Sequence, residues 1–294
     1  MIERVLILGT GLLGASTGLA LRAVGFTGPI IGWDKDSRQS AEALARNAID
    51  AVASHPLAAA EASQLILLAM PVFAILDWME QLAPILGPTH LVTDVGSTKS
   101  LITRTGNRLF NDSGRAGFLP GHPMAGKEVG GASQADAGLF QGAVWIFTSE
   151  SAQDSADENP SAMSIRSAEL AASWRHWVGA IGCRTLDLEA NRHDELVAWV
   201  SHLPQFLATA LTALLQSELG AAPELTAVGG RALREMTRLG SSPYTMWRDI
   251  ALTNTETIAA TLQALEQRLA HLRENLRTPE LRDEFDLANR FRKG

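Results

Sequence analysis

The 294-residue chain has one cysteine and no long uninterrupted hydrophobic run. Cys183 has no partner for an intrachain disulfide, which favours a reducing compartment. The longest apolar run, residues 65–76, is 12 residues long and contains Pro71, whereas a transmembrane helix needs about 20 residues. The first residues lack the basic segment and the longer apolar segment of a signal peptide. We therefore expect a soluble, cytoplasmic protein with no membrane partner.

Basic residues are also in deficit, since 25 Lys and Arg stand against 32 Asp and Glu, a formal net charge of −7. This balance argues against nucleic-acid binding, which needs a basic surface. An anionic ligand would have to be attracted by local arginines. Apolar residues are plentiful at 46%, enough for hydrophobic cores, and the length predicts about two domains.

Short apolar runs alternate with helix-forming segments over residues 1–188. The runs are continuous, as in strands that are buried on both faces of a parallel sheet. We expect strands at residues 5–8, 30–33, 65–70 and 91–95, and helices at 15–24 and 37–47. A strand at 143–148, an exposed loop over 149–164, a helix at 167–180 and a strand at 183–187 should complete that sheet. This order predicts a Rossmann-type, doubly wound α/β domain over residues 1–188.

Residues 189–294 have a different pattern, which predicts an all-α C-terminal domain. We expect helices at residues 190–219, 223–239 and 246–277, followed by a short tail to residue 290. Pro204 should kink the first helix or free a carbonyl near it. The apolar face of helix 246–277 is expected to pair with a second copy of the chain in a homodimer.

The motif GTGLLG, residues 9–14, stands directly between the first strand and the first helix. Glycines at this spacing allow a tight turn, close approach of the backbone to a pyrophosphate, and close packing of helix on strand. The N–H groups at the start of the helix then face the phosphates. An ordinary tight turn is the alternative, but the strand–turn–helix context favours a dinucleotide site.

Asp34 ends the second expected strand. Its carboxylate can accept hydrogen bonds from the adenosine ribose and would repel a 2′-phosphate, so we predict NAD as cofactor. Lys35 and Arg38 could turn toward a phosphate, which leaves NADP open. The predicted cofactor-binding residues are Gly9, Gly11, Leu12, Leu13, Gly14, Asp34, Pro71 and Ser97.

Two other strand ends carry reactive side chains, and open α/β sheets bind ligands beyond these ends. In DVGSTK, residues 94–99, Ser97 could act at the site or could simply cap the next helix. In GHPMAGKE, residues 121–128, His122 lies between Gly121 and Pro123 and so is not inside a helix. Histidine is suited to proton exchange near neutral pH, and we predict that His122 is catalytic.

The order of the motifs resembles one enzyme family. The three motifs are followed by His193-Asp194, by SHLP at residues 201–204, and by Thr237-Arg238 ahead of MWRDI at residues 246–250. From residue 5 to about residue 250, the sequence is similar to the prephenate/arogenate dehydrogenases of tyrosine biosynthesis. GHPMAGKE and SHLP are far more specific to that family than the glycine motif is.

The resemblance implies NAD(P)-dependent oxidative decarboxylation, of prephenate to 4-hydroxyphenylpyruvate or of arogenate to tyrosine. It also implies a dinucleotide-binding domain joined to a helical domain that binds substrate and dimerises. In that family the residue matching His122 contacts the ring hydroxyl, the one matching Ser97 lies near it and the nicotinamide, and the one matching Arg238 holds the ring carboxylate. The pocket would be bordered by Lys127, Glu128 and Trp247. No metal is required.

An arginine anchor suits a substrate with two carboxylates. Arg231, Arg234 and Arg238 have the i, i+3, i+7 spacing of one helix face. For Arg231 and Arg234, a solvated stripe paired with Glu224 and Glu235 is an equal alternative. For Arg238, the spacing to MWRDI favours substrate binding.

His202 and Gln205 are three residues apart and are both predicted to approach the substrate, although His202 could equally pack between helices. His193-Asp194 is interpreted as a helix cap. Gln205 stands where relatives often have histidine, and Gly240-Ser241-Ser242-Pro243 lacks the aspartate usual before that proline. Both differences border the position of the substrate side chain, so the choice between prephenate and arogenate stays open.

Two other functions are alternatives. β-Hydroxyacid dehydrogenases and imine reductases share this domain order, but they take their proton donor from the helical domain and do not need GHPMAGKE. A dinucleotide sensor would bind NAD without turnover, and the combination of His122 with the arginines argues against it. The expected partner is a small-molecule substrate.

Overall fold

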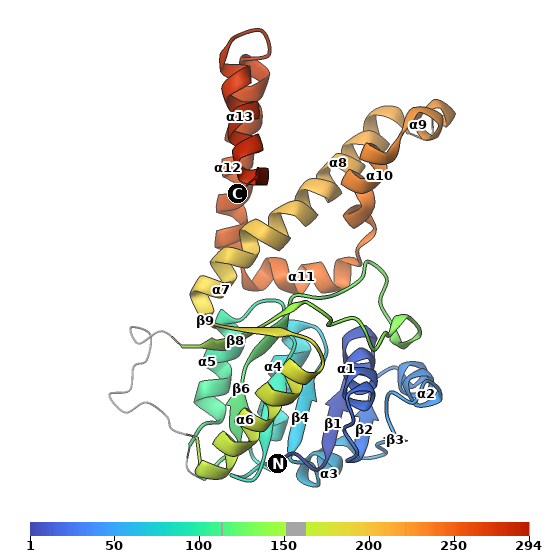
Figure 1. Ribbon diagram of the computed structural model, residues 1–294, viewed down its shortest axis with the longest axis vertical. Helices are drawn as coiled ribbons and strands as arrows, with labels where there is room; N and C mark the ends of the chain where they lie inside the picture. The colour runs from blue at the N-terminus through green and yellow to red at the C-terminus, as the bar shows by residue number, and fades with distance from the viewer. Residues whose placement is uncertain (113, 151–162, 221, 294) are drawn as a thin grey trace.

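The computed structural model describes residues 1–112, 114–150, 163–220 and 222–293. An α/β part forms the lower half of Figure 1, and a helical part extends from it in two arms. One arm contains α8 and α10, and the other contains α12 and α13. The predicted class, a Rossmann-type sheet followed by a helical region, is confirmed.

The main sheet has six parallel strands in the order β3-β2-β1-β4-β5-β6. The strands are β1 (Val5–Leu8), β2 (Ile30–Trp33), β3 (Ala51–Val52), β4 (Leu65–Leu68), β5 (Leu91–Asp94) and β6 (Gly117–Leu119). Every residue of β1 and β4 is buried, because helices cover both faces of the sheet. The four strands expected in this region are therefore confirmed, while β3 and β6 were too short for the sequence pattern to indicate.

Helices cover the two faces of the sheet in the way a doubly wound fold requires. Ile7 and Leu67 pack on one face with residues of α1, α2 and α6, and Leu6 and Leu68 pack on the other with residues of α3, α4 and α5. The helices are α1 (Leu12–Ala23), α2 (Ser37–Ala45), α3 (Pro56–Glu61), α4 (Val72–Leu82), α5 (Ser100–Leu109) and α6 (Ile165–Ala180), with a short 3₁₀ turn η1 (Ala132–Gln134).

The late strands do not complete the main sheet, so this expectation was wrong. They form a second sheet in the order β7-β8-β9, made of β7 (Gly121–Pro123), β8 (Val144–Ser149) and β9 (Arg184–Glu189). Pro120 separates β6 from β7 and has no N–H to continue the ladder. Beyond it, the N–H of Gly121 bonds to the carboxylate of Asp94 (3.1 Å), and β7 pairs antiparallel with β8. Residues 151–162 of the expected loop lie outside the described residues.

The described elements beyond β9 are helical. They are α7 (Ala190–Val197), a π-helical turn η2 (Ala198–His202), α8 (Leu203–Leu219), α9 (Pro223–Val228), α10 (Arg231–Thr237), a 3₁₀ turn η3 (Arg238–Ser241), α11 (Tyr244–Thr253), α12 (Thr255–Glu274) and α13 (Glu280–Lys293). The expected distortion at Pro204 is present as η2, where the helix widens just before the residue that lacks an N–H.

Three expectations for this half need correction. The helix expected at 223–239 breaks at Gly229 and Gly230. The helix expected at 246–277 breaks at Asn254, which has φ −139° and ψ 35° and whose side chain donates to the carbonyl of Asp194 (2.9 Å). The expected tail is the helix α13, and Glu284 pairs with Arg268 of α12 (2.6 Å).

By length and composition alone, one continuous helical stretch of the described residues, 190–219, could cross a membrane. Such a stretch is weak support for a span, because helices of soluble proteins pass the same test. Near its start it is buried against the α/β part, where Asp194 accepts from the N–H groups of Lys99 and Ser100.

Candidate active site

The glycine motif forms the turn between β1 and α1. Gly9 has φ +90°, and a Cβ there would collide with the carbonyl oxygen of Ala69 on the neighbouring segment. A Cβ on Gly14 would collide with the carbonyl oxygen of Gly9. A Cβ on Gly11 would meet nothing within 4 Å, so the backbone there faces open space. The turn thus combines two closely packed glycines with one glycine, Gly11, that borders open space.

Helix N-termini gather at the carboxyl edge of the sheet, and two of them are capped from the helical part. The carboxylate of Asp194 on α7 accepts from the N–H groups of Lys99 (2.7 Å) and Ser100 (2.9 Å) at the start of α5. Asp249 on α11 accepts from the N–H of Phe73 in the first turn of α4 (3.3 Å). These carboxylates satisfy N–H groups and the positive end of each helix dipole.

The N-terminus of α1 is different, because no side chain of the described residues caps it and its first turn has no acidic residue. It starts at Leu12 and Leu13, directly after Gly11. Its free N–H groups and its dipole suit an anionic group such as a pyrophosphate. Pro71, the other predicted contact in this region, lies exposed at the N-cap of α4.

Asp34 lies against this turn. Its carboxylate accepts from the N–H groups of Thr10 (2.8 Å) and Asp36 (3.0 Å). Arg38 is paired with Asp36 (2.9 Å) and is 88% exposed. The carboxylate is therefore fixed beside the expected phosphate position, while the nearby guanidinium has an acidic partner of its own.

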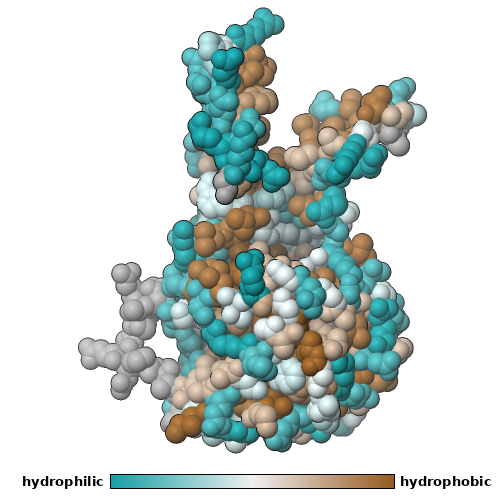
Figure 2. Space-filling view, in the orientation of Figure 1, coloured by the Kyte–Doolittle hydropathy of each residue, from teal (hydrophilic) through white to brown (hydrophobic). Residues whose placement is uncertain are grey.

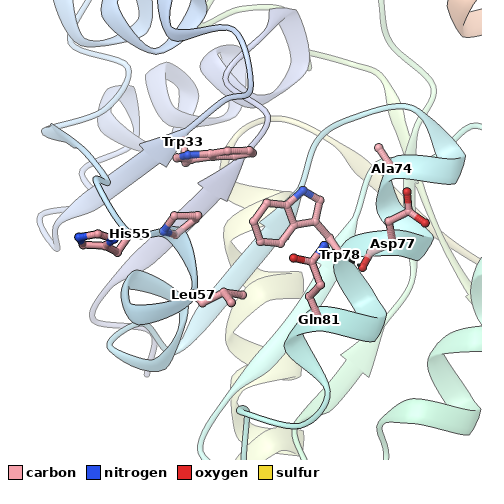
Figure 3. Close-up of a pocket in the computed structure, with 8 residues that line it drawn as sticks. Trp33, His55, Leu57, Ala74, Asp77, Trp78 and Gln81 are labelled. Atoms are coloured by element: carbon pink, nitrogen blue, oxygen red, sulfur yellow. Dashed lines mark hydrogen bonds between the residues drawn. The ribbon is translucent and has the colours of Figure 1, made fainter.

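A cavity of about 550 Å³ opens beside Trp33, the residue before Asp34. Trp33 and Trp78 meet edge to face, with ring centroids 5.1 Å apart. Figure 3 shows these two rings with His55 and Leu57 from the start of α3 and with Asp77 and Gln81 from α4. The cavity thus offers flat aromatic surfaces at the residue that precedes Asp34 in the chain.

His122 lies on β7 and is 8% exposed. Its Nδ1 is 2.8 Å from Nε2 of His193, and Nδ1 of His193 is 2.8 Å from Oδ1 of Asp194. His193 and Asp194 belong to α7, so the second half of the chain supplies the hydrogen-bond partner of His122 and the carboxylate behind it. The capping interpretation of Asp194 was wrong in part, because it caps α5 and its own helix is capped by Glu189.

A fully buried ion pair lies next to this histidine. Lys99 pairs with Asp94, and both side chains are 0% exposed. Nζ of Lys99 also donates to the carbonyl of Gly121 (2.8 Å), while the Asp94 carboxylate accepts from the N–H of Gly96 (2.7 Å). The pair therefore ties β5, the start of α5 and the residue before His122 together.

These surroundings affect the protonation of His122. Burial lowers the pKa of His122 well below its usual value of 6.5, and the neighbouring His193, Lys99 and His202 lower it further. Burial also lowers the pKa of His193, against the opposing effect of the Asp194 carboxylate. His122 is therefore neutral at pH 7 and can accept a proton.

Ser97 is half-buried in the segment between β5 and α5. The alternative that it caps α5 was wrong, because the helix begins at Ser100 and Asp194 occupies its N-terminus. A role of Ser97 at the site stays a prediction.

His202 and Trp247 meet edge to face at 5.8 Å. His202 is 1% exposed, and burial lowers its pKa to about 4. The indole N–H of Trp247 is buried without a hydrogen-bond partner among the described residues. It is thus a donor that a ligand could satisfy.

Gln205 is 4% exposed and has its amide engaged. Its Nε2 donates to the carbonyl of Leu239 (2.7 Å) and to Thr209 (3.2 Å), and its Oε1 accepts from Ser242 (3.0 Å). These bonds fix the η3 turn, which begins at Arg238, against α8.

Arg238 forms an ion pair with Glu128, and so brings the GHPMAGKE loop to η3. Lys127 bonds instead to the carbonyl of Gln134 (2.8 Å). The other two arginines of the predicted stripe differ, since Arg231 is 86% exposed and pairs with Glu235 (2.6 Å) and Arg234 contacts the carbonyl of Gly229 (3.4 Å). Arg238 lies beyond the end of α10, and so the three do not share one α-helix.

Sequence reasoning missed four functional candidates: Asp94, Lys99, His193 and Asp194. All four were within motifs quoted for the resemblance. The signal that could have found them is the rarity of buried charge, because acids and lysines inside a specific motif are rarely there for solubility.

Comparison with known proteins gives the family. The family model of the prephenate dehydrogenase nucleotide-binding domain matches residues 17–159, and that of the prephenate dehydrogenase dimerization domain matches residues 189–292. The chain belongs to the prephenate dehydrogenase family. The change from sheet to helices at residue 189 coincides with the start of the second match.

Three relatives illustrate the similarity within the family. Prephenate dehydrogenase of Lactococcus lactis is 29% identical over 294 residues, which cover 100% of this chain and 76% of the relative. The crystal structure of prephenate dehydrogenase from A. aeolicus with hydroxyphenyl propionate and NAD+ has 27% identity and a TM-score of 0.79, covering 100% of this chain and 96% of that one. Synechocystis arogenate dehydrogenase has 27% identity and a TM-score of 0.74, covering 99% of both chains.

Proposed function

We propose that the chain catalyses the NAD-dependent oxidative decarboxylation of prephenate to 4-hydroxyphenylpyruvate. The observation that carries this proposal is the buried, neutral His122 at the carboxyl edge of the sheet, backed by His193. Arogenate is the second candidate substrate, because an arogenate dehydrogenase is among the similar solved structures.

The chemistry needs a base and an orienting anchor. His122 accepts the proton of the ring hydroxyl. Bound NAD would supply the acceptor for the hydride that leaves the ring carbon carrying that hydroxyl. The resulting ketone is para to the carbon with the carboxylate, so loss of carbon dioxide produces an aromatic phenol. Because that step is strongly downhill, the chain need only hold the ring in place.

Arg238 is proposed as the anchor of the ring carboxylate. It is paired with Glu128 and stays 61% exposed, so a substrate carboxylate can reach its remaining N–H groups. His202, Trp247 and Gln205 are proposed to border the substrate, with the unsatisfied indole N–H of Trp247 as a donor.

The dinucleotide is proposed to lie along the edge from His122 to Trp33. Its pyrophosphate fits the uncapped start of α1, and its adenosine ribose fits Asp34. The adenine fits the aromatic cavity of Trp33 and Trp78. The carboxylate of Asp34 would repel the 2′-phosphate of NADP, and the guanidinium of Arg38 is already paired with Asp36. Both features favour NAD over NADP.

We propose that residues 189–294 form the helical domain. Its two arms are proposed to form the contacts of a homodimer. Figure 2 shows brown, hydrophobic residues on the sides of the arms that face each other. The exposed apolar side chains of α8 and of the α12–α13 segment include Leu214, Leu219, Leu269, Leu276, Phe285 and Leu287. A single chain leaves this apolar area in water, which a second copy would remove.

The experiment that tests the proposed function is an assay of four combinations, prephenate or arogenate with NAD or NADP, followed by reduction of the nicotinamide. We expect turnover of prephenate with NAD, and a rate with NADP at least tenfold lower in kcat/KM. Binding of NAD without turnover of either substrate would instead support a dinucleotide sensor.

A further inference from the structure

His122, His193 and Asp194 form one continuous chain of hydrogen bonds. The two links are both 2.8 Å long, from Nδ1 of His122 to Nε2 of His193 and from Nδ1 of His193 to Oδ1 of Asp194. The three residues are 8%, 0% and 4% exposed. Water is therefore kept from both links, and each atom must be satisfied by its neighbour.

Burial and connectivity fix where the protons lie. An ionised carboxylate only accepts, so Nδ1 of His193 carries a hydrogen and donates to Asp194. Neutral His193 then has a lone pair on Nε2, and Nδ1 of His122 must donate to it. Neutral His122 consequently has its lone pair on Nε2, which is the nitrogen left to act as a base.

Asp194 is well held in the ionised form. Its carboxylate accepts from the N–H groups of Lys99 and Ser100 at the N-terminus of α5, where the helix dipole favours negative charge. Although burial raises it, hydrogen bonds from His193, Ser100 and Lys99 lower the pKa of Asp194 below its usual value. Asn254 also donates to its backbone carbonyl (2.9 Å).

We propose that His193 and Asp194 are positioning residues that hold His122 in its Nδ1–H tautomer and stabilise the imidazolium formed in turnover. The inference rests on the proposed function. In the step concerned, the O–H bond of the substrate hydroxyl breaks and an N–H bond forms at Nε2 of His122. Hydride leaves the carbon that carries this hydroxyl and passes to the bound NAD. The positive charge of His122 is shared along the hydrogen bonds toward Asp194.

The tautomer can be measured without turnover. In ¹⁵N-histidine-labelled protein, two-bond ¹H–¹⁵N correlation spectra distinguish Nδ1–H from Nε2–H rings, and the chain has only seven histidines to assign. We expect the Nδ1–H tautomer at His122 in the wild type. In Asp194→Asn the amide oxygen can keep the bonds from the Lys99 N–H and from Nδ1 of His193, so the tautomer should persist while the negative charge is lost. In His193→Leu, residue 193 no longer accepts from Nδ1 of His122, and we expect the preference for the Nδ1–H tautomer to be lost.

Kinetics of matched variants provide the second readout. Asp194→Asn should lower kcat by about tenfold or more, with KM for substrate and for NAD within about threefold, because a neutral amide stabilises the imidazolium less than a carboxylate does. His193→Gln keeps an oxygen that accepts from His122, so its kcat should exceed that of His193→Leu by about tenfold. Glu195→Gln, an exposed acid on the same helix, is the control and should change neither constant.

The outcomes separate the inference from the function. The inference is overturned if wild-type His122 is protonated on Nε2 while neutral, or if His193→Leu keeps kcat within about threefold. If Asp194→Asn fails to fold because the cap of α5 is lost, the comparison of His193→Gln with His193→Leu still tests the inference. A wild type that oxidises neither substrate, while His193→Leu still loses the Nδ1–H preference of wild-type His122, contradicts the proposed function and supports the positioning roles.

Discussion

Gly11 and Gly14 belong to one motif but have different surroundings. A Cβ on Gly11 would meet nothing within 4 Å, whereas a Cβ on Gly14 would collide with the carbonyl of Gly9. At the residue scale, the two should therefore fail in different ways when replaced.

Gly11→Ala should leave stability unchanged and weaken NAD binding by about tenfold or more, because the added methyl occupies the space reserved for the pyrophosphate. Gly14→Ala should lower the free energy of unfolding by about 1–3 kcal/mol through overpacking. Thermal unfolding and calorimetric titration with NAD measure the two effects. Equal NAD affinity in Gly11→Ala would place the phosphates elsewhere.

Arg238→Lys should raise KM for the substrate by about tenfold or more, since lysine lacks the planar fork that binds a carboxylate with two hydrogen bonds. KM for NAD should stay within about twofold. Arg231→Lys is the control, because Arg231 is 86% exposed and paired with Glu235. An unchanged substrate KM in Arg238→Lys would remove the anchor role.

Single residues were predictable from sequence to different degrees. The glycine motif, Asp34 and His122 could be singled out because their residue types and spacing match a known chemistry. The partners of His122 could not, because the link from His193 joins residues 71 positions apart and depends on how α7 docks. The cap of α5 likewise comes from Asp194, about 95 residues away in sequence.

At the element scale, strands buried on both faces were visible as apolar runs, and helix breaks were not. The break at Asn254 depends on its side-chain bond to the Asp194 carbonyl, which no local pattern encodes. Similarly, β7 leaves the main sheet because Pro120 and the Asp94 carboxylate replace the next ladder bond. The distortion near Pro204 could be predicted from the sequence, because a proline disturbs a helix only near its own position.

The π-helical turn η2 ends at His202, whose pKa burial lowers to about 4 in the folded chain. The unfolded chain, with a histidine pKa near 6.5, binds this proton more readily. Stability from His202 is thus complete above pH 6.5 and is lost as the pH falls toward 4, by about 3 kcal/mol in all.

Urea unfolding of wild type and His202→Asn at several pH values tests this expectation. The wild type should lose more stability than the variant between pH 6.5 and 4. Replacement of the exposed His55 by asparagine serves as control and should keep the wild-type slope. Identical slopes in wild type and His202→Asn would mean that His202 is not buried as a neutral ring.

At the scale of the whole molecule, two carboxylates of the helical part, Asp194 and Asp249, cap helices of the α/β part. The proposed active site thus lies where the two parts meet, with the proposed base His122 on β7 and its positioning residues His193 and Asp194 on α7. The arms point away from this junction and carry apolar surface (Figures 1 and 2).

Light scattering at micromolar concentration should give twice the 31.5 kDa mass of one chain. Replacing Leu269 or Phe285, which are 50% and 63% exposed, by glutamate should shift the mass toward the monomer, because charge would be buried in the contact. Val129 is 62% exposed and lies outside the arms, so Val129→Glu should leave the mass unchanged. A monomeric wild type would contradict the dimer.

The role of His122 as base is tested most directly by His122→Asn, which keeps a polar side chain but cannot take up the proton. Steady-state kinetics with prephenate and NAD should show kcat lowered by about 10²- to 10⁴-fold, while KM for both stays within a few-fold. A variant with wild-type kcat would contradict the account.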